Sequence, residues 1–396
     1  MKISYKVWLI SIIAITCIFI IHFLIPTMVN GFQRDIHHIR QWQSIWNDDY
    51  GVRLCLDRMQ LCEFYRRPLM YRTQMFLFTQ GIPYQFSFVA ISFVGLFITG
   101  IMLTKIASLM GIVEKFLPIV IIAFYAHFTI VFAFFDSMST YDEPLMYVFL
   151  STAIYFILKQ KLWLAFPFFL LACIARETSF MLLPIVFITP GKNSLHKKIG
   201  FAALLITAYC LYFYYYVPPN LRFASASFLV HDRIYAWQHN FRNIYESIQS
   251  ILCMILATAL PFYMLYNCLQ KPSITFFQKR WIQYTLALIV INNVIVLAFG
   301  LAAEARLFAL PLLLAFPMLP LYVQLNSFHI PWKNKRFLIS LFVVIIMSTL
   351  FVIFGYRCYE SNIHAVFLFK TYTVLYFICF WITIFRPVLH ISPRWG

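Results

Sequence analysis

The residues of this sequence that could do chemistry are carboxylates and arginines that we expect on one face of a membrane. The sequence contains 14 Asp and Glu residues, and in the topology derived below all of them except Glu114 face away from the cytoplasm. Most arginines follow the acidic residues, whereas nearly all lysines lie on the opposite side. An ionised carboxylate can act as a general base toward a hydroxyl, and arginine binds phosphate through two parallel hydrogen bonds. Together they predict a site that moves a group off a phosphate-bearing lipid.

Four separate stretches of the sequence deliver these residues to one face. The first is the polar stretch 27–84, which contains the candidates Asp35, Asp48, Asp49, Arg67, Tyr71 and Arg72. The others lie at the ends of apolar runs and contain Asp136, Asp142 and Glu143, then Arg176 and Glu177, then Glu304 and Arg306. Each group alone fits a structural ion pair between helix ends, because charges near the bilayer are costly and usually paired. Their joint placement on one face favours a functional site.

Composition and run length predict the fold class. The 396 residues are 62% hydrophobic and 11% charged, with a mean hydropathy of +0.79, a balance that excludes a soluble domain. Apolar runs of about 18 residues or more recur along the chain, and they are continuous rather than alternating, so they predict helices and not a barrel. We expect an all-α, polytopic transmembrane helical bundle with about 10–12 membrane segments. It would form one domain over residues 1–396.

The lysines set the predicted orientation. Lys2 and Lys6 precede the first run, so the positive-inside rule places the N-terminus in the cytoplasm and residues 27–84 outside. The C-terminus is then also cytoplasmic. The net charge of +17 comes from cations dispersed between apolar runs, so it does not indicate nucleic-acid binding. The predicted runs are 7–26, 85–104, 116–135, 143–158, 162–190, 199–217, 247–268, 281–300, 307–325, 337–356 and 366–385.

Residues 162–190 admit two interpretations. Both flanks are basic, with Lys161 before the run and Lys197 after it, so an even number of crossings fits. We expect two short half-helices with the segment 176–178 at the outer turn. A single tilted helix with a buried ion pair is the alternative, and it would invert the topology of everything downstream.

The polar stretch 27–84 also raises the question of surface helices and of a metal. Residues 49–59 and 70–80 are amphipathic and predict helices that lie on the membrane surface, although a plain solvated loop fits the composition as well.

His37 and His38 are adjacent, and adjacent side chains mostly point apart, so they favour no metal site. Cys55 and Cys62 could form a disulfide only if the segment between them is not helical. The sequence does not require a divalent metal ion, and whether the protein binds one stays open.

Four short elements resemble a known family. They are Asp48-Asp49-Tyr50, Arg67-Pro68-Leu69-Met70-Tyr71-Arg72, Arg176-Glu177-Thr178 and Glu304-Ala305-Arg306. With a short first helix and a long outer loop, this pattern resembles the GT-C superfamily of polytopic membrane glycosyltransferases. The elements span most of the chain, although each is short and degenerate.

The resemblance implies a glycosyltransferase that takes a sugar from a polyprenyl-phosphate donor on the extracytoplasmic face. The acceptor would be a lipid or a surface glycan. Separately, the absence of Asn-x-Ser/Thr sequences and the short loops favour a bacterial inner membrane. Asp49 would act on the acceptor, with Asp48 and Asp35 as the next candidates. Arg67, Arg72, Arg176 and Arg306 would hold the leaving phosphate as charge develops, supported by Tyr71, Asp142, Glu143, Glu177 and Glu304.

Three other functions remain open. A multi-pass transporter would place ionisable residues near the membrane midplane, as Arg176 and Glu177 would be if 162–190 were one helix. A polysaccharide polymerase or ligase also handles lipid-linked glycans with outer arginines, but its large outer loop usually comes late in the chain. A purely structural membrane subunit is the third alternative.

Overall fold

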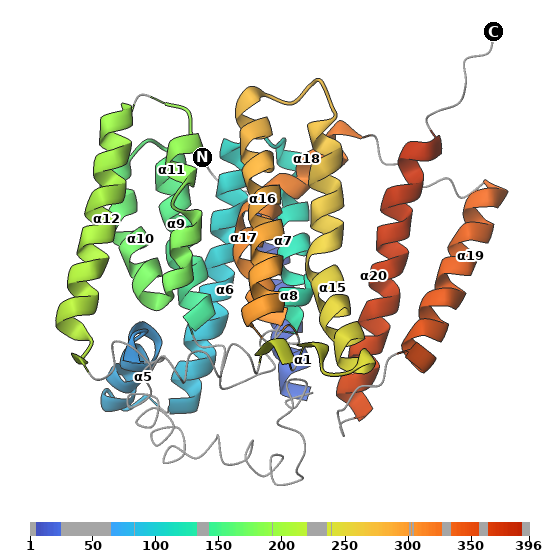
Figure 1. The fold of residues 1–396 in the computed structure, drawn as a ribbon, viewed down its shortest axis with the longest axis horizontal. Coiled ribbons are helices and arrows are strands. Elements are labelled where there is room, and N and C mark those ends of the chain that lie inside the picture. The colour runs from blue at the N-terminus through green and yellow to red at the C-terminus, as the bar shows by residue number, and fades with distance from the viewer. Residues whose placement is uncertain are drawn as a thin grey trace.

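The computed structural model of the chain is built of helices (Figure 1). No strand occurs in the part of the chain that it describes, which consists of residues 5–24, 65–82, 84–132, 142–191, 193–219, 236–238, 240–300, 302, 305–326, 334–355 and 363–389. Seven helical stretches in this part are long and apolar enough to cross a membrane. The chain is therefore an integral membrane protein of helical type.

The seven long stretches account for most of the bundle. Five of them are single α-helices: α6 (Tyr84–Leu109), α12 (Leu195–Tyr216), α15 (Ile244–Leu269), α16 (Phe276–Phe299) and α20 (Ile363–Leu389). A sixth combines α19 (Lys335–Leu350) with the π-helical turn η7 (Phe351–Gly355). The seventh joins η5 (Ala305–Phe308), α17 (Ala309–Ala315), η6 (Phe316–Met318) and α18 (Leu319–Leu325).

Shorter helices pack among these long ones. They are α1 (Tyr5–Leu24), α5 (Leu69–Thr79), η2 (Glu114–Phe116), α7 (Leu117–Tyr125), α8 (Phe128–Val131), α9 (Asp142–Leu158), α10 (Leu162–Ala175), η4 (Glu177–Leu182) and α11 (Ile185–Ile188). In Figure 1, α5 lies at the lower end of the bundle, while α19 and α20 stand at its right edge. Met70, Tyr71 and Gln74 form the buried face of α5.

The core centres on α9, which packs against α6 on one side and α10 on the other. Its side chains Tyr147, Leu150 and Ile154 are almost fully buried in one continuous hydrophobic cluster. Gly95 of α6 faces the start of α9: a Cβ atom at this position would lie 3.2 Å from the Cβ atom of Pro144. The missing side chain thus permits the close approach that fixes the beginning of α9.

Residues 162–190 double back on themselves. Helix α10 ends at Ala175, Arg176 adopts an extended conformation, and η4 packs against α10. Helix α11 then packs against α12 and α16. The side chain of Gln160 donates a hydrogen bond of 2.7 Å to the carbonyl oxygen of Pro190, and Asn193 donates one of 3.3 Å to the carbonyl oxygen of Gln160. The two ends of the segment therefore lie together, and Arg176 lies at the far turn.

Polar contacts tie the helices together at both ends of the bundle. We call these ends the lysine end, where Gln278 and Met110 lie, and the site end, where Asn240 and Gly300 lie. At the lysine end, Gln278 donates a hydrogen bond of 2.7 Å to the carbonyl oxygen of Met110. At the site end, the side-chain amide of Asn240 donates to the carbonyl oxygens of Leu297 and Gly300. The oxygen of the same amide accepts a hydrogen bond from the backbone of Ala302. These contacts hold the end of α16 together with Gly300 and Ala302.

Candidate functional site

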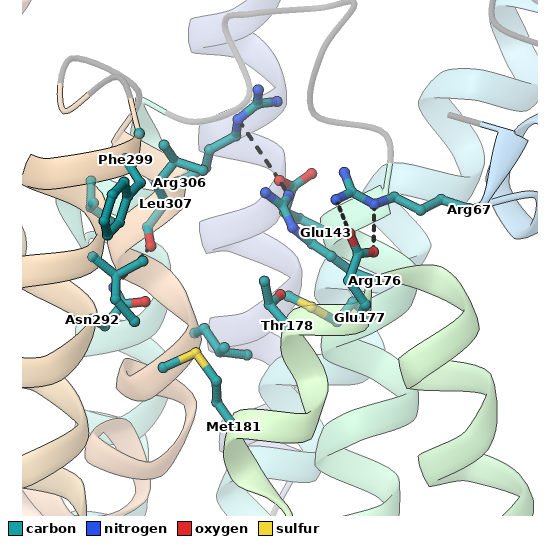
Figure 2. Close-up of a pocket in the computed structure, with 15 residues that line it drawn as sticks. Arg67, Glu143, Arg176, Glu177, Thr178, Met181, Asn292, Phe299, Arg306 and Leu307 are labelled. Atoms are coloured by element: carbon teal, nitrogen blue, oxygen red, sulfur yellow. Dashed lines mark hydrogen bonds and ion pairs between the residues drawn. The ribbon is translucent and has the colours of Figure 1, made fainter. Parts of the chain in front are cut away.

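A cavity of about 250 Å³ opens at the site end between two walls of helices. One wall comes from α9, from Arg176 just after α10 and from η4, and the other comes from α16, η5 and α17 (Figure 2). The cavity is lined by Arg67, Glu143, Met146, Arg176, Glu177, Thr178, Met181, Asn292, Ile295, Val296, Phe299, Gly300, Arg306, Leu307 and Leu310. Three arginines against two glutamates give this lining one net positive charge.

Arg67 and Glu177 form a two-pronged ion pair at one edge of the cavity. The Nε and Nη2 atoms of Arg67 lie 2.8 and 2.6 Å from the two carboxylate oxygens of Glu177. Such fork-to-fork geometry is the strongest and most directional form of an arginine–carboxylate contact. The pair connects the segment just before α5 to the first residue of η4, and so ties α5 to the turn at Arg176.

Glu143 lies between the other two arginines (Figure 2). Its Oε1 atom contacts the Nη1 atom of Arg176 and lies 3.8 Å from the Nε atom of Arg306. The Glu143 side chain is 3% exposed, and those of Arg176 and Arg306 are 14% and 9% exposed. Two guanidinium groups from different walls thus meet at one buried carboxylate.

The local backbone separates the neighbouring residues Arg176 and Glu177. Arg176 has φ −158° and ψ 121°, which ends α10 and lets η4 begin at Glu177. The hydroxyl of Ser179 donates a hydrogen bond of 3.0 Å to the carbonyl oxygen of Ala172, which fastens the turn. Because of this turn, Arg176 reaches α9 while Glu177 reaches Arg67.

The opposite wall is held by side-chain amides. Asn292 of α16 donates a hydrogen bond of 2.9 Å to the carbonyl oxygen of Leu307, next to Arg306. Deeper in the bundle, the hydroxyl of Tyr284 donates a bond of 2.6 Å to the carbonyl oxygen of Met181 and so joins the two walls. These bonds fix the distance across which Arg306 and Glu143 face one another.

Tyr71 and Arg72 lie outside the cavity lining. The hydroxyl of Tyr71 is 3.4 Å from that of Tyr216 on α12, and the guanidinium group of Arg72 lies 5.7 Å from the centre of the Tyr71 ring. Burial, followed by the contact with Tyr216, raises the pKa of the Tyr71 phenol above its usual range. The hydrogen bond with Tyr216 raises the pKa of Arg72, so both groups keep their protons at neutral pH.

The structure brings Arg67, Glu143, Arg176, Glu177 and Arg306 together, out of the residues that the sequence indicates. Asp142 is the first residue of α9, and only its backbone is described. The remaining candidates, and the histidine and cysteine pairs of the polar stretch, lie outside the described residues: Asp35, His37, His38, Asp48, Asp49, Cys55, Cys62, Asp136 and Glu304.

Sequence reasoning missed the α16 wall of the cavity, which supplies Asn292, Ile295 and Phe299. A signal for it exists, because Asn292 and Asn293 interrupt the apolar run 281–300, and polar residues inside a membrane helix commonly line a bundle interior or a cavity. The sequence around Thr178 and Met181 gives no comparable signal, because their position in the cavity depends on the path that the chain takes after Arg176.

The arrangement can bind an anion and can present a carboxylate beside it. Within the ranges that the structure describes, no three His, Cys, Asp or Glu side chains come together in a way that could hold a metal ion. Comparison of the chain with models of protein families, with curated proteins and with solved structures finds no match.

Proposed function

We propose that the protein is a membrane glycosyltransferase that transfers a sugar from a polyprenyl-phosphate donor to a lipid or surface glycan. Arg176 and Arg306 bind the phosphate and stabilise the negative charge that grows on it as the sugar leaves, while Arg67 is held by both oxygens of Glu177. The cavity faces the extracytoplasmic side, where a lipid-linked donor replaces the cytoplasmic nucleotide sugars.

One observation carries the proposal. Arg67, Arg176 and Arg306 come from three separate segments and line one cavity at the same end of a membrane bundle. Glu143 and Glu177 balance two of these three cations. The lining keeps one net positive charge, which is costly to desolvate and fits a ligand that brings negative charge. Arginine suits this ligand because it stays charged and matches phosphate geometry.

The apolar side of the cavity supports a lipid-borne donor. Ile295 and Phe299 line the cavity, yet they are 41% and 50% exposed on the surface of α16. Since α16 is long and apolar enough to span the membrane, these side chains meet lipid. A phosphate at the arginines could therefore keep its hydrocarbon chain in the bilayer.

The test compares surface glycans and lipid-linked sugars by mass spectrometry in cells that lack the protein. We expect a glycan one sugar short, restored by wild type. Arg306→Gln should restore less than about a tenth as much, because charge-assisted hydrogen bonds contribute roughly 1.5–3 kcal/mol each. The matched control is Arg280→Gln at the lysine end, where Arg280 lies over the ring of Phe276; it should restore the glycan as wild type does. Unchanged glycans in every strain would overturn the proposal.

A transporter is the second candidate, favoured by the break between α10 and η4 beside the buried contact of Glu143 with Arg176. Interrupted membrane helices with ionisable residues are typical of transporter binding sites. If that function holds, cells lacking the protein would retain completed lipid-linked sugars on one side of the membrane. The same mass spectrometry, done on right-side-out and inverted vesicles, separates the two cases.

A further inference from the structure

The carboxylate of Glu143 is incompletely hydrogen-bonded within the described part of the chain. Its shortest contacts with Arg176 and with Arg306 are both made by Oε1. Among the residues that the structure describes, Oε2 is buried and has no hydrogen-bond partner, although Glu143 lines the cavity and is 2% exposed as a residue. A buried acceptor on a charged group is costly when it lacks a hydrogen bond, and such an atom calls for an explanation, of which a catalytic role is one when the residue lines a cavity.

Glu177 shows what a purely structural carboxylate looks like in the same cavity. Both of its oxygens accept hydrogen bonds from Arg67, at 2.8 and 2.6 Å. Its bonding capacity toward the guanidinium group is therefore filled within the protein. Glu143 is more deeply buried than Glu177 and yet is less completely bonded.

A second polar atom without a hydrogen bond lies on the same face of α9. Tyr147 follows Glu143 by four residues, so the two side chains are neighbours on the helix surface. The hydroxyl of Tyr147 is buried and, within the described part of the chain, has no hydrogen-bond partner. The start of α9 thus gathers unused hydrogen-bonding capacity beside the arginines.

We propose that Glu143, rather than Asp49, is the carboxylate that binds the attacking hydroxyl of the acceptor and takes its proton. This inference rests on the function proposed above. The hydroxyl donates its hydrogen bond to Oε2 of Glu143, and its oxygen attacks the anomeric carbon of the sugar. The new carbon–oxygen bond forms as the bond from the anomeric carbon to the phosphate oxygen breaks. The proton passes to Glu143, and the electron pair leaves with the lipid phosphate.

The positions of the charges support this division of roles. Arg306 approaches Glu143 from the wall opposite α9, so a phosphate held by Arg306 and Arg176 would lie next to the carboxylate (Figure 2). The attacking oxygen must also lie near the phosphate-bearing carbon. One carboxylate oxygen therefore keeps the arginines in place while the other meets the nucleophile.

The role of Glu143 predicts that Glu143→Gln lowers glycan extension without lowering phosphate affinity. Glu143→Gln keeps the size of the side chain but removes a negative charge that repels the bound phosphate. We expect its affinity for farnesyl phosphate, measured on purified protein in bilayer discs, to equal that of wild type or to exceed it by up to about tenfold. Glycan extension in cells should nevertheless fall by about 100-fold or more, as is typical when a general base is lost.

Two further variants and one control complete the experiment. Glu143→Asp retains the charge that holds Arg176 and Arg306, so it should accumulate and bind farnesyl phosphate normally while it extends the glycan poorly. Asp49→Asn should extend the glycan as wild type does, whereas Glu143→Asp should not. Glu246→Gln is the matched control, because Glu246 at the start of α15 also has a buried Oε2 atom without a hydrogen bond in the described structure, yet does not line the cavity.

Each outcome decides a separate claim. Wild-type extension by Glu143→Gln, or a loss of farnesyl phosphate binding in parallel with activity in both Glu143 variants, would overturn the role of Glu143. The second result would mean that the residue only positions the arginines. If wild type itself restores no glycan and binds farnesyl phosphate no better than farnesol, the proposed function fails instead.

Discussion

Arg67 and Glu177 satisfy each other through two hydrogen bonds, whereas Arg176 and Arg306 share a single oxygen of Glu143. The first arrangement is self-contained and joins α5 to η4. The second leaves Oε2 of Glu143, a residue that lines the cavity, without a hydrogen bond from the described residues. Residues of the same two types thus serve different purposes within one site, and substitutions should separate them.

For the first pair, we expect Arg67→Gln to lower the stability of the protein. The change leaves Glu177 partly buried without its cation, and this should cost roughly 1–3 kcal/mol. The double variant Arg67→Met with Glu177→Leu removes both charges and should recover most of that loss. Thermal unfolding in detergent measures the effect, and Arg280→Gln is the control, because Arg280 does not line the cavity and lies over the ring of Phe276. Equal midpoints for Arg67→Gln and Arg280→Gln would contradict the structural role.

The membrane level of these residues could be predicted from the sequence, but their partners could not. Arg176 and Glu177 are adjacent and suggest a pair with each other, as do Glu304 and Arg306. The structure pairs Arg176 with Glu143 and Glu177 with Arg67, because the extended residue Arg176 turns the two side chains apart. Contacts between distant segments depend on packing that no single run of sequence encodes. The assignment of these arginines as phosphate ligands stays a prediction.

At the scale of the elements, the start of α9 depends on how closely α6 approaches it. Gly95 faces Pro144, the residue after Glu143, and a Cβ atom at Gly95 would lie 3.2 Å from that of Pro144. Proline at this position also belongs to the first turn of the helix, where its missing N–H is tolerated. The placement of Glu143 therefore depends on a glycine in another helix.

We expect Gly95→Leu to push α9 away from α6 and to misplace Glu143. Overpacking of this kind typically costs about 1–3 kcal/mol, and glycan extension should fall by more than the amount of folded protein does. Gly200→Leu is the matched control, since nothing lies within 4 Å of the site that a Cβ atom at Gly200 would occupy on α12. Both amounts can be measured in the same cells by immunoblot and glycan mass spectrometry. Identical behaviour of the two variants would show that the α6–α9 contact does not govern the site.

Hydropathy indicated the helices of the described part, because an apolar segment in lipid must satisfy its backbone hydrogen bonds internally and does so as a helix. It could not indicate where they break. The run 307–325 is continuous in sequence, but the structure divides it at Phe316 and Pro317 into α17, η6 and α18. Likewise, the run 116–135 contains the break at His127 between α7 and α8. Such breaks arise where proline or a side-chain cap interrupts the backbone bonds, which an average over the run conceals.

At the scale of the whole molecule, the helical bundle has two polar ends, the lysine end and the site end, and an apolar middle. The described glutamates of the cavity lie at the site end, and Lys161, Lys198, Lys271 and Lys279 lie at or near helix ends on the other side. Ile295 and Phe299 line the cavity and are also exposed on α16. A ligand that combines a phosphate with a long hydrocarbon chain matches this whole arrangement.

The most direct test maps where such a ligand binds. Wild-type protein in bilayer discs would be irradiated with a farnesyl phosphate analogue that carries a diazirine on its first isoprene unit, and the adducts located by peptide mass spectrometry. We predict adducts at Met181, Ile295 or Phe299, which line the cavity beside the arginines, and their loss when unlabelled farnesyl phosphate, but not farnesol, is added. Adducts spread over the exposed apolar faces of α19 and α20, insensitive to that competition, would contradict a lipid-phosphate site in this cavity.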